Sequence, residues 1–173
     1  MKIAVVGPGA MGCLFAARLA QSGAKTYLVD HRGERAEVLE KQGIKVESDG
    51  GIITARPQVS LSVPNGADVA IVLTKAYDTG ALRFPAEMPV LRPQNGLGNV
   101  EGLCALVCSA RVLAGATTEA ATLLGPGHVR HVAHGETAFG AWTSCPTDQA
   151  QQALSAAGFQ VDVTDSPGQL IWE

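Results

Sequence analysis

The chain begins with Met1-Lys2-Ile3-Ala4-Val5-Val6-Gly7-Pro8-Gly9-Ala10-Met11-Gly12, which places three glycines in the spacing GxGxxG directly after a short apolar run. The following residues favour a helix that ends at Gly23, so the segment predicts a strand, a tight turn and a helix. Gly7 permits the turn, Gly9 lets the backbone approach phosphates without a Cβ, and Gly12 lets helix and strand pack closely. We therefore expect residues 7–12 to hold the pyrophosphate of a dinucleotide at the N-terminus of the helix.

Apolar and amphipathic segments alternate along the rest of the chain, which is typical of a doubly wound α/β fold. Segment 68–74 is apolar almost without alternation, so we place it mid-sheet as a parallel strand. Asp49-Gly50 predicts an antiparallel hairpin insertion over 44–55. We expect a Rossmann-like, mainly parallel sheet with helices on both faces. The other expected strands are 26–30, 111–115, two within 129–139 that join near Gly135, and 159–163, and the other expected helices are 34–42, 100–107 and 148–157.

The length of 173 residues suits one domain with a core of its own. We assign residues 1–166 to this dinucleotide-binding domain. Asp165-Ser166-Pro167 is a helix start, with a capping hydroxyl and proline at the first helical position. The few residues that follow would make only a marginal helix on their own. We expect 167–173 to begin an interdomain helix, with a helical C-terminal substrate domain absent.

Charge and hydropathy exclude several classes of partner. The formal net charge of -3 gives no basic face for nucleic acid or for anionic lipid. No apolar run approaches the roughly 20 residues of a membrane-spanning helix, and Lys2–Val6 is too short for the core of a signal peptide. The sequence therefore predicts a cytoplasmic protein with no nucleic acid and no membrane among its partners.

No metal site is expected. The chain has four cysteines without a CxxC pair: Cys13, Cys104, Cys108 and Cys145. Because no His or carboxylate cluster follows them in the sequence, buried free thiols are the favoured interpretation. Three histidines recur at a spacing of three: His128, His131 and His134. On an extended chain this spacing scatters side chains over both faces, so we expect surface histidines.

Polar residues follow two of the predicted strands. Asp30 ends the second strand, eighteen residues after Gly12, where an acid can hold the ribose hydroxyls of NAD. His31 and Arg32 come next, and a guanidinium there could instead bind the 2′-phosphate of NADP. The sequence therefore leaves both NAD and NADP as possible cofactors. Lys75 follows the buried strand 68–74, on the edge of the sheet where ligands bind, and Asn95 is either a cleft amide or half of an Asn-Gly turn.

Several motifs, taken in order, resemble the ketopantoate reductase family over the whole chain. They are the glycine motif at 7–12, Thr74-Lys75-Ala76-Tyr77-Asp78-Thr79, Gln94-Asn95-Gly96-Leu97-Gly98-Asn99, Gly115-Ala116-Thr117-Thr118 and Gly125-Pro126-Gly127-His128-Val129. The resemblance implies NADPH-dependent reduction of a small 2-keto acid, ketopantoate, to pantoate, on the route to pantothenate and coenzyme A. NADH remains an alternative cofactor, and a homodimer is left open.

The resemblance also assigns residues to the site. It implies that Lys75 and Asn95 line the cleft between cofactor and substrate, that Ala121 contacts the cofactor, and that His31 or Arg32 binds the 2′-phosphate. The catalytic lysine of the family would follow Glu173 directly, so no catalytic residue is assigned within the chain and the 173 residues are expected to be inactive alone.

Two departures from the family pattern stand out. The segment between Lys75 and Asn95 is short, and its prolines replace a helix and a strand, so damage to the sheet is expected there. Asp30 is the second departure and keeps the NADP preference open. Two other functions remain: the cofactor domain of another 2-hydroxyacid dehydrogenase, and a non-catalytic module that senses dinucleotides.

Overall fold

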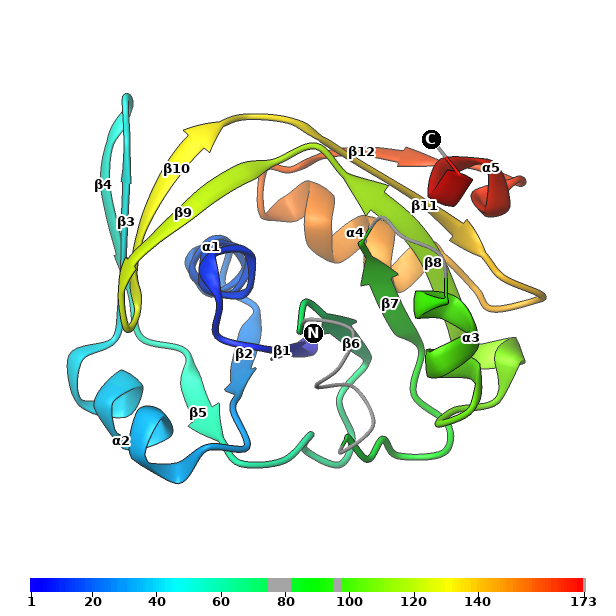
Figure 1. The fold of residues 1–173 in the computed structure, drawn as a ribbon, viewed down its shortest axis with the longest axis horizontal. Helices are drawn as coiled ribbons and strands as arrows, with labels where there is room; N and C mark the ends of the chain where they lie inside the picture. The colour runs from blue at the N-terminus through cyan, green and yellow to red at the C-terminus, as the bar shows by residue number, and fades with distance from the viewer. Residues whose placement is uncertain (75–81, 95–97, 173) are drawn as a thin grey trace.

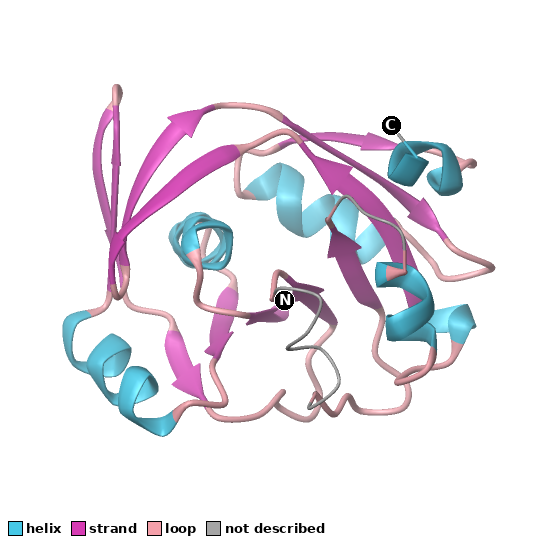
Figure 2. Cartoon of the chain, viewed as in Figure 1, coloured by secondary structure: helices cyan, strands magenta, loops and turns pink. Residues whose placement is uncertain are grey.

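The larger of two sheets forms the body of the fold. The structure, a computed structural model, describes residues 1–74, 82–94 and 98–172. The sheet has eight strands, and all neighbours run parallel except β8 and β11. In spatial order they are β12 (Gln160–Val163), β11 (Glu136–Ala141), β8 (Val112–Thr117), β7 (Val90–Pro93), β6 (Val69–Val72), β1 (Lys2–Val6), β2 (Lys25–Val29) and β5 (Gln58–Ser60). The predicted Rossmann-like, mainly parallel sheet is confirmed (Figure 1, Figure 2).

The strand order reverses beside β1, with β2 on one side and β6 on the other. Val6 is in register with Val29 of β2 and with Val72 of β6, so the carboxyl ends of the three strands are level. In open α/β sheets, ligands bind in the crevice outside such a switch point. The topology therefore brings the residues that follow β1, β2 and β6 to one edge of the sheet.

A second sheet of four strands was not expected. Its spatial order is β4 (Gly51–Ala55), β3 (Ile44–Ser48), β10 (His128–Ala133) and β9 (Ala120–Gly125). The hairpin around Asp49-Gly50 is confirmed, but it is not an isolated insertion, because β3 pairs in parallel with β10. Figure 1 shows β9 and β10 passing over α1 (Ala10–Gln21).

Helix α1 explains why the second sheet forms. Its buried residues face all directions around the helix axis, and they include Cys13, Leu14, Phe15, Ala16 and Ala17. One face packs on β1 and β2, and others contact β3, β4, β9 and β10. A helix that is apolar on all sides must be covered on all sides, so one sheet cannot bury it.

The remaining helices lie close to their predicted positions, except for one short 3-10 helix that was not predicted. They are α2 (Gly33–Gln42), α3 (Asn99–Cys104), the 3-10 helix η2 (Ser109–Arg111), α4 (Asp148–Ala156) and α5 (Pro167–Trp172). Helix α3 ends three residues before the predicted Val107, and η2 follows. Pro167 begins α5, as expected, and α5 contacts β8 and β11. Within the described ranges no helix has the length and hydropathy needed to span a membrane.

The expected damage to the sheet near the prolines is not observed. Strand β7 pairs in parallel with β6 and β8, so the sheet is continuous. Pro89 lacks an N–H but keeps its carbonyl, which accepts a hydrogen bond from Ala70 N at 2.9 Å. Pro93 is the last residue of β7. Proline is tolerated here because it lies before the strand and at its end.

Candidate dinucleotide-binding site

The three glycines of the first turn have different structural roles. Gly7 has a φ of 103°, and a Cβ there would lie 2.8 Å from Thr74 N. A Cβ on Gly12 would lie 1.6 Å from the carbonyl oxygen of Gly7, so α1 can approach the turn only because Gly12 has no side chain. A Cβ on Gly9 would meet no atom within 4 Å. The backbone at Gly9 is therefore open on the side that a ligand can approach.

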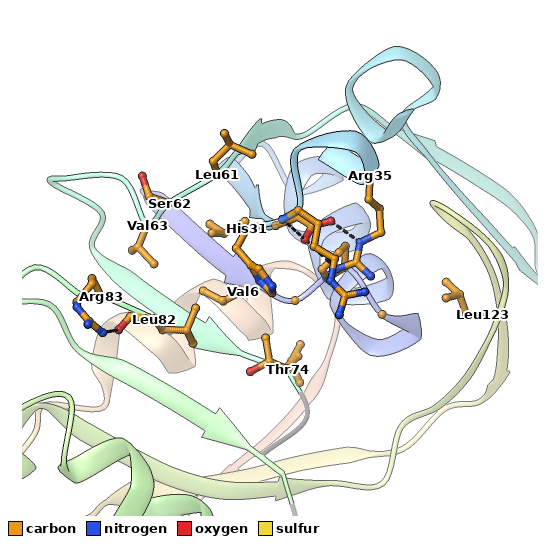
Figure 3. Close-up of a pocket in the computed structure, with 17 residues that line it drawn as sticks. Val6, His31, Arg35, Leu61, Ser62, Val63, Thr74, Leu82, Arg83 and Leu123 are labelled. Atoms are coloured by element: carbon orange, nitrogen blue, oxygen red, sulfur yellow. Dashed lines mark hydrogen bonds and ion pairs between the residues drawn. The ribbon is translucent and has the colours of Figure 1, made fainter. Parts of the chain in front are cut away.

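A pocket of about 400 Å³ lies against this turn, and Gly7, Pro8 and Gly9 form part of its wall. The rest of the wall comes from the ends of β1, β2 and β6, from the loops after β5 and before β7, and from β9. The further lining residues are Val29, Leu61, Ser62, Val63, Leu73, Leu82 and Leu123 (Figure 3). Gly9 is also the N-cap residue of α1, and no acidic side chain lies in the first turn. The wall formed by the turn therefore suits an anion.

Asp30 lines the pocket, but its carboxylate already has partners. Arg35 Nε donates to Asp30 Oδ2, Arg35 Nη2 donates to Oδ1 at 2.8 Å, and Arg32 N donates to Oδ1 at 3.0 Å. Burial by itself raises the pKa of Asp30, but these hydrogen bonds outweigh it and hold the pKa below its ordinary value. Asp30 is thus an ionised, side-chain-buried partner of Arg35, whose side chain is 36% exposed.

Cationic side chains surround this end of the pocket. His31 and Arg32, both predicted from the sequence, are exposed and line it. Arg35 lines the same wall, whereas Arg83, from the loop before β7, lies beside Leu82 on the opposite side of the pocket (Figure 3). Because Arg35 balances the charge of Asp30, the Arg32 guanidinium leaves this end of the pocket net positive. A group carrying a phosphate is electrostatically favoured here.

Thr74 marks the other end of the crevice, after β6. Its Oγ1 is buried, and no hydrogen-bond partner for this oxygen lies in the described part of the chain. Because Thr74 lines the pocket, a bound polar ligand could satisfy that hydroxyl. Lys75 and Asn95, the predicted cleft residues, lie outside the described residues.

Four of the described residues that were predicted to bind the cofactor do not line the pocket, and one of them, Gly12, is buried within α1. Ala10, Met11 and Ala121 are partly buried and pack against the core, as side chains of α1 and β9. From the same strand β9 it is Leu123 that reaches the pocket. Sequence reasoning missed Leu123 because no strand was predicted over 120–125, and nothing local indicated that this segment would pass over the turn. It missed Arg35 too, although a cation on the helix after Asp30 is a weak charge-pairing signal.

The interpretation of the histidines as surface residues is wrong for His131. Its side chain is 4% exposed and its Nε2 lies 2.6 Å from Glu119 Oε2. His131 lies two residues after the fully buried Val129, so the two side chains share the buried face of β10.

The four thiols are free, but only two are buried as expected. Burial raises the pKa of Cys13 to about 12 and also raises the pKa of Cys145. Cys104 is partly exposed and Cys108 is exposed, because α3 ends before the two positions can share a buried helix face.

Comparison with known proteins gives a consistent result. The family model of ketopantoate reductase PanE/ApbA matches residues 3–144. A 2-dehydropantoate 2-reductase of Halobacterium salinarum is 34% identical, over 100% of this chain and 61% of the relative. A 2-dehydropantoate 2-reductase of Pyrococcus horikoshii is 30% identical, over 96% of this chain and 57% of the relative.

Solved structures agree with the sequence relatives. The structure of 2-dehydropantoate 2-reductase from Geobacter metallireducens superposes with a TM-score of 0.86 at 26% identity, over 99% of this chain and 60% of the other. D-mandelate dehydrogenase in a ternary structure with NADH and anilino(oxo)acetate gives 0.86 at 27% identity, over 99% of this chain and 59% of the other. The chain thus spans 61% or less of the length of these proteins. Because the family model covers most of its residues, the chain belongs to the ketopantoate reductase family.

Proposed function

We propose that this chain is the NADPH-binding part of an oxidoreductase of the 2-dehydropantoate 2-reductase type. The observation that carries the proposal is the open backbone at Gly9, which faces a pocket with a cationic far end. When bound, the cofactor would supply a hydride to the 2-keto carbon of ketopantoate, and uptake of a proton by the resulting alkoxide would give pantoate. The described residues bind and orient that cofactor: the turn holds the pyrophosphate, and the loop after β2 holds the ribose end.

The choice of NADPH over NADH rests on Asp30. In NAD-binding sites the acid at this position accepts hydrogen bonds from the ribose hydroxyls and repels a 2′-phosphate. Here both carboxylate oxygens already accept hydrogen bonds from Arg35, and one also accepts from Arg32 N. His31 and Arg32, which follow Asp30, add donors around the same space. The arrangement favours the phosphorylated cofactor.

The substrate side of the proposal rests on the family. Lys75 and Asn95 are proposed to line the cleft, with Thr74 beside them at the end of β6. Residues 1–166 are proposed as the cofactor domain, and α5 as the start of the link to a substrate domain. A cytoplasmic location is part of the proposal, since free thiols such as Cys13 and Cys145 are typical of reducing compartments.

Calorimetric titration with NADPH and NADH tests the cofactor assignment. We expect NADPH to bind more tightly, and Arg32→Ala to weaken NADPH about tenfold while NADH changes little, because only NADPH has the phosphate that Arg32 would contact. Arg130→Ala is the matched control, because Arg130 is a 60% exposed arginine on β10 that does not line the pocket. Equal weakening of both cofactors by Arg32→Ala would remove the proposed role, and no binding of either would remove the proposal.

A second candidate function is reduction of a different 2-keto acid with NADH. The likeness to D-mandelate dehydrogenase, solved with NADH and anilino(oxo)acetate, favours it. Tighter binding of NADH in the same titration would select this alternative.

A further inference from the structure

A second group of functional side chains lies away from the pocket, on the second sheet. Glu119, His131 and His134 each present one ligand atom, and these atoms lie within 4.8 Å of one another. The side chains of Glu119 and His131 are 2% and 4% exposed, whereas His134 is exposed. A glutamate is almost never fully buried unless it is paired, and Glu119 is paired with both Arg18 and His131.

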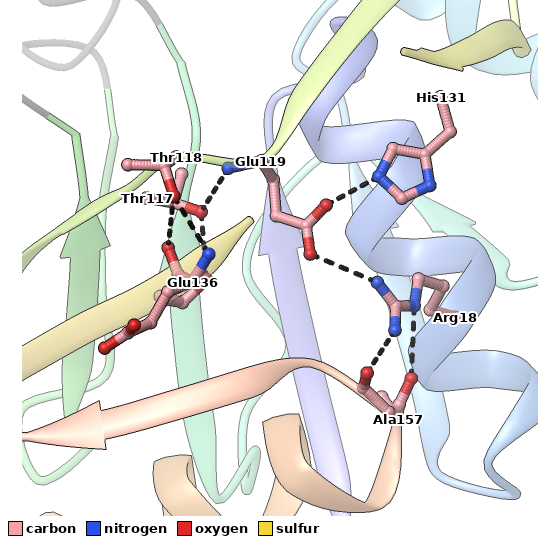
Figure 4. A network of polar contacts seen from close by, with 9 residues as sticks. Arg18, Thr117, Thr118, Glu119, His131, Glu136 and Ala157 are labelled. Carbon is pink, nitrogen blue, oxygen red and sulfur yellow. Dashed lines mark hydrogen bonds and ion pairs between the residues drawn. The ribbon is translucent and has the colours of Figure 1, made fainter. Parts of the chain in front are cut away.

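The Glu119 carboxylate is held in a fixed orientation. Its Oε2 lies 2.6 Å from His131 Nε2, and its Oε1 accepts from Arg18 Nη1 at 3.3 Å (Figure 4). The Arg18 guanidinium is anchored in turn, since it also donates to the carbonyl oxygens of Ala157 and Gly158. Arg18 therefore occupies one oxygen of Glu119 and leaves the other facing the imidazoles, as hydrogen bonds do for carboxylates that bind metals.

A strand irregularity brings the two imidazoles together. Residues three apart on a regular strand point to opposite faces. The register shift between His131 and Ala133 and the turn that follows β10 place the His131 and His134 rings 4.2 Å apart, at 71° to each other. Bulges of this kind redirect side chains near functional sites.

We propose that Glu119, His131 and His134 bind a divalent transition metal of the zinc class, with water as the fourth ligand. Two imidazoles and a carboxylate are an established ligand set for Zn²⁺, whereas Mg²⁺ and Ca²⁺ prefer oxygen ligands. Tetrahedral bonds of about 2.0–2.1 Å separate neighbouring ligand atoms by about 3.3 Å. To reach this geometry, Glu119 Oε2 and His131 Nε2, which lie 2.6 Å apart, would separate slightly, and the exposed side chain of His134 would turn toward them.

The location assigns the metal a structural role. Glu119 precedes β9, His134 follows β10, and Arg18 connects the group to α1 and to the connection between α4 and β12. The metal would join these elements at the end of α1 that is remote from the phosphate turn, since eight residues of helix separate Ala10 from Arg18, or about 12 Å. Binding therefore stabilises the fold without changing cofactor affinity. The Arg18 cation opposes a second cation, so we expect affinity on the order of micromolar rather than tighter.

Titration of the 173-residue chain with ZnCl₂, followed by calorimetry and by thermal unfolding, tests the site. We expect one Zn²⁺ per chain and a raised Tm. His134→Gln should weaken binding about 100-fold while leaving the metal-free Tm unchanged, because His134 is exposed. His128→Gln is the matched control: His128 lies on β10, the strand that precedes His134, and is paired with Glu47 at 2.7 Å, but it lies outside the cluster.

The exposed thiols are the competing explanation for zinc binding. A Cys104→Ser, Cys108→Ser double variant should bind zinc as the unchanged protein does. Absence of zinc binding, unchanged binding by His134→Gln, or loss of binding in the cysteine variant would each overturn the proposal. The affinity for NADPH is measured in a separate titration with and without zinc. Absence of zinc binding would therefore leave the cofactor assignment intact.

Discussion

Gly9 and Gly12 are three residues apart in one turn, but a methyl group should have a different effect at each. A Cβ on Gly9 meets no atom within 4 Å, so Gly9→Ala should keep its Tm and lose dinucleotide affinity, because the methyl group takes the space of the phosphates. A Cβ on Gly12 meets the Gly7 carbonyl, so Gly12→Ala should lose about 1–3 kcal/mol of unfolding free energy or more.

Thermal unfolding and NADPH titration of both variants measure the two effects separately. Gly23→Ala is the control for the loss of a glycine at a site that does not line the pocket. Because Gly23 has a φ of 89°, this variant should have a lower Tm. Its NADPH affinity should be unchanged at temperatures where the protein is folded. Full NADPH affinity in Gly9→Ala would contradict the placement of the pyrophosphate at this turn.

Asp30 shows what local sequence leaves open at the level of one residue. An acid at the end of the second strand favours NAD, and the adjacent Arg32 favours NADP. We propose that Arg35 decides between them, because it lies on the first turn of α2 and donates hydrogen bonds to both carboxylate oxygens of Asp30. A partner five residues away is within reach of sequence reasoning, but whether its side chain turns toward Asp30 or toward solvent depends on how α2 leaves the sheet.

Helix α1 is the element on which both sheets depend. Phe15 is fully buried in it, and its ring stacks on Phe159 with centroids 4.2 Å apart. We expect Phe15→Ala to cost about 3–5 kcal/mol, because the cavity would open between α1 and the connection to β12. Urea unfolding measures this. Val38→Ala, at a 42% exposed position on α2, is the control and should change stability little. A loss for Phe15→Ala below that of the control would show that α1 is not central to the core.

Strand β10 shows where periodicity fails at the level of an element. Alternation of faces predicts that His131 and His134 lie apart, and the rule is correct for a regular strand. The register shift against β9 breaks the rule within two residues. Since a bulge depends on the partner strand, it could not be predicted from β10 itself, and the cluster with Glu119 was missed.

At the scale of the whole molecule, the cofactor pocket and the catalysis of the family are separable. The relative from Halobacterium salinarum is matched over only 61% of its length. We expect the 173-residue chain to bind NADPH without oxidising it when ketopantoate is added, because positioning of the substrate and a proton donor normally come from both sides of a cleft. NADPH absorbance over time measures this, with heat-treated protein as the control. Robust turnover by these residues alone would contradict the expectation.

The sequence by itself determined the alternation of most strands and helices, the glycine turn and the hairpin at Asp49-Gly50, because short-range sterics and hydrophobic period fix them. It did not determine the strands β5, β7 and β9, which are held by their neighbours in the sheets. Only the tertiary structure decided that a second sheet covers α1, that Leu123 and Arg83 reach the pocket, and that Glu119 meets His131. These contacts join residues that are far apart in the chain. Their geometry depends on how strands twist and shift past one another, and no local pattern encodes that.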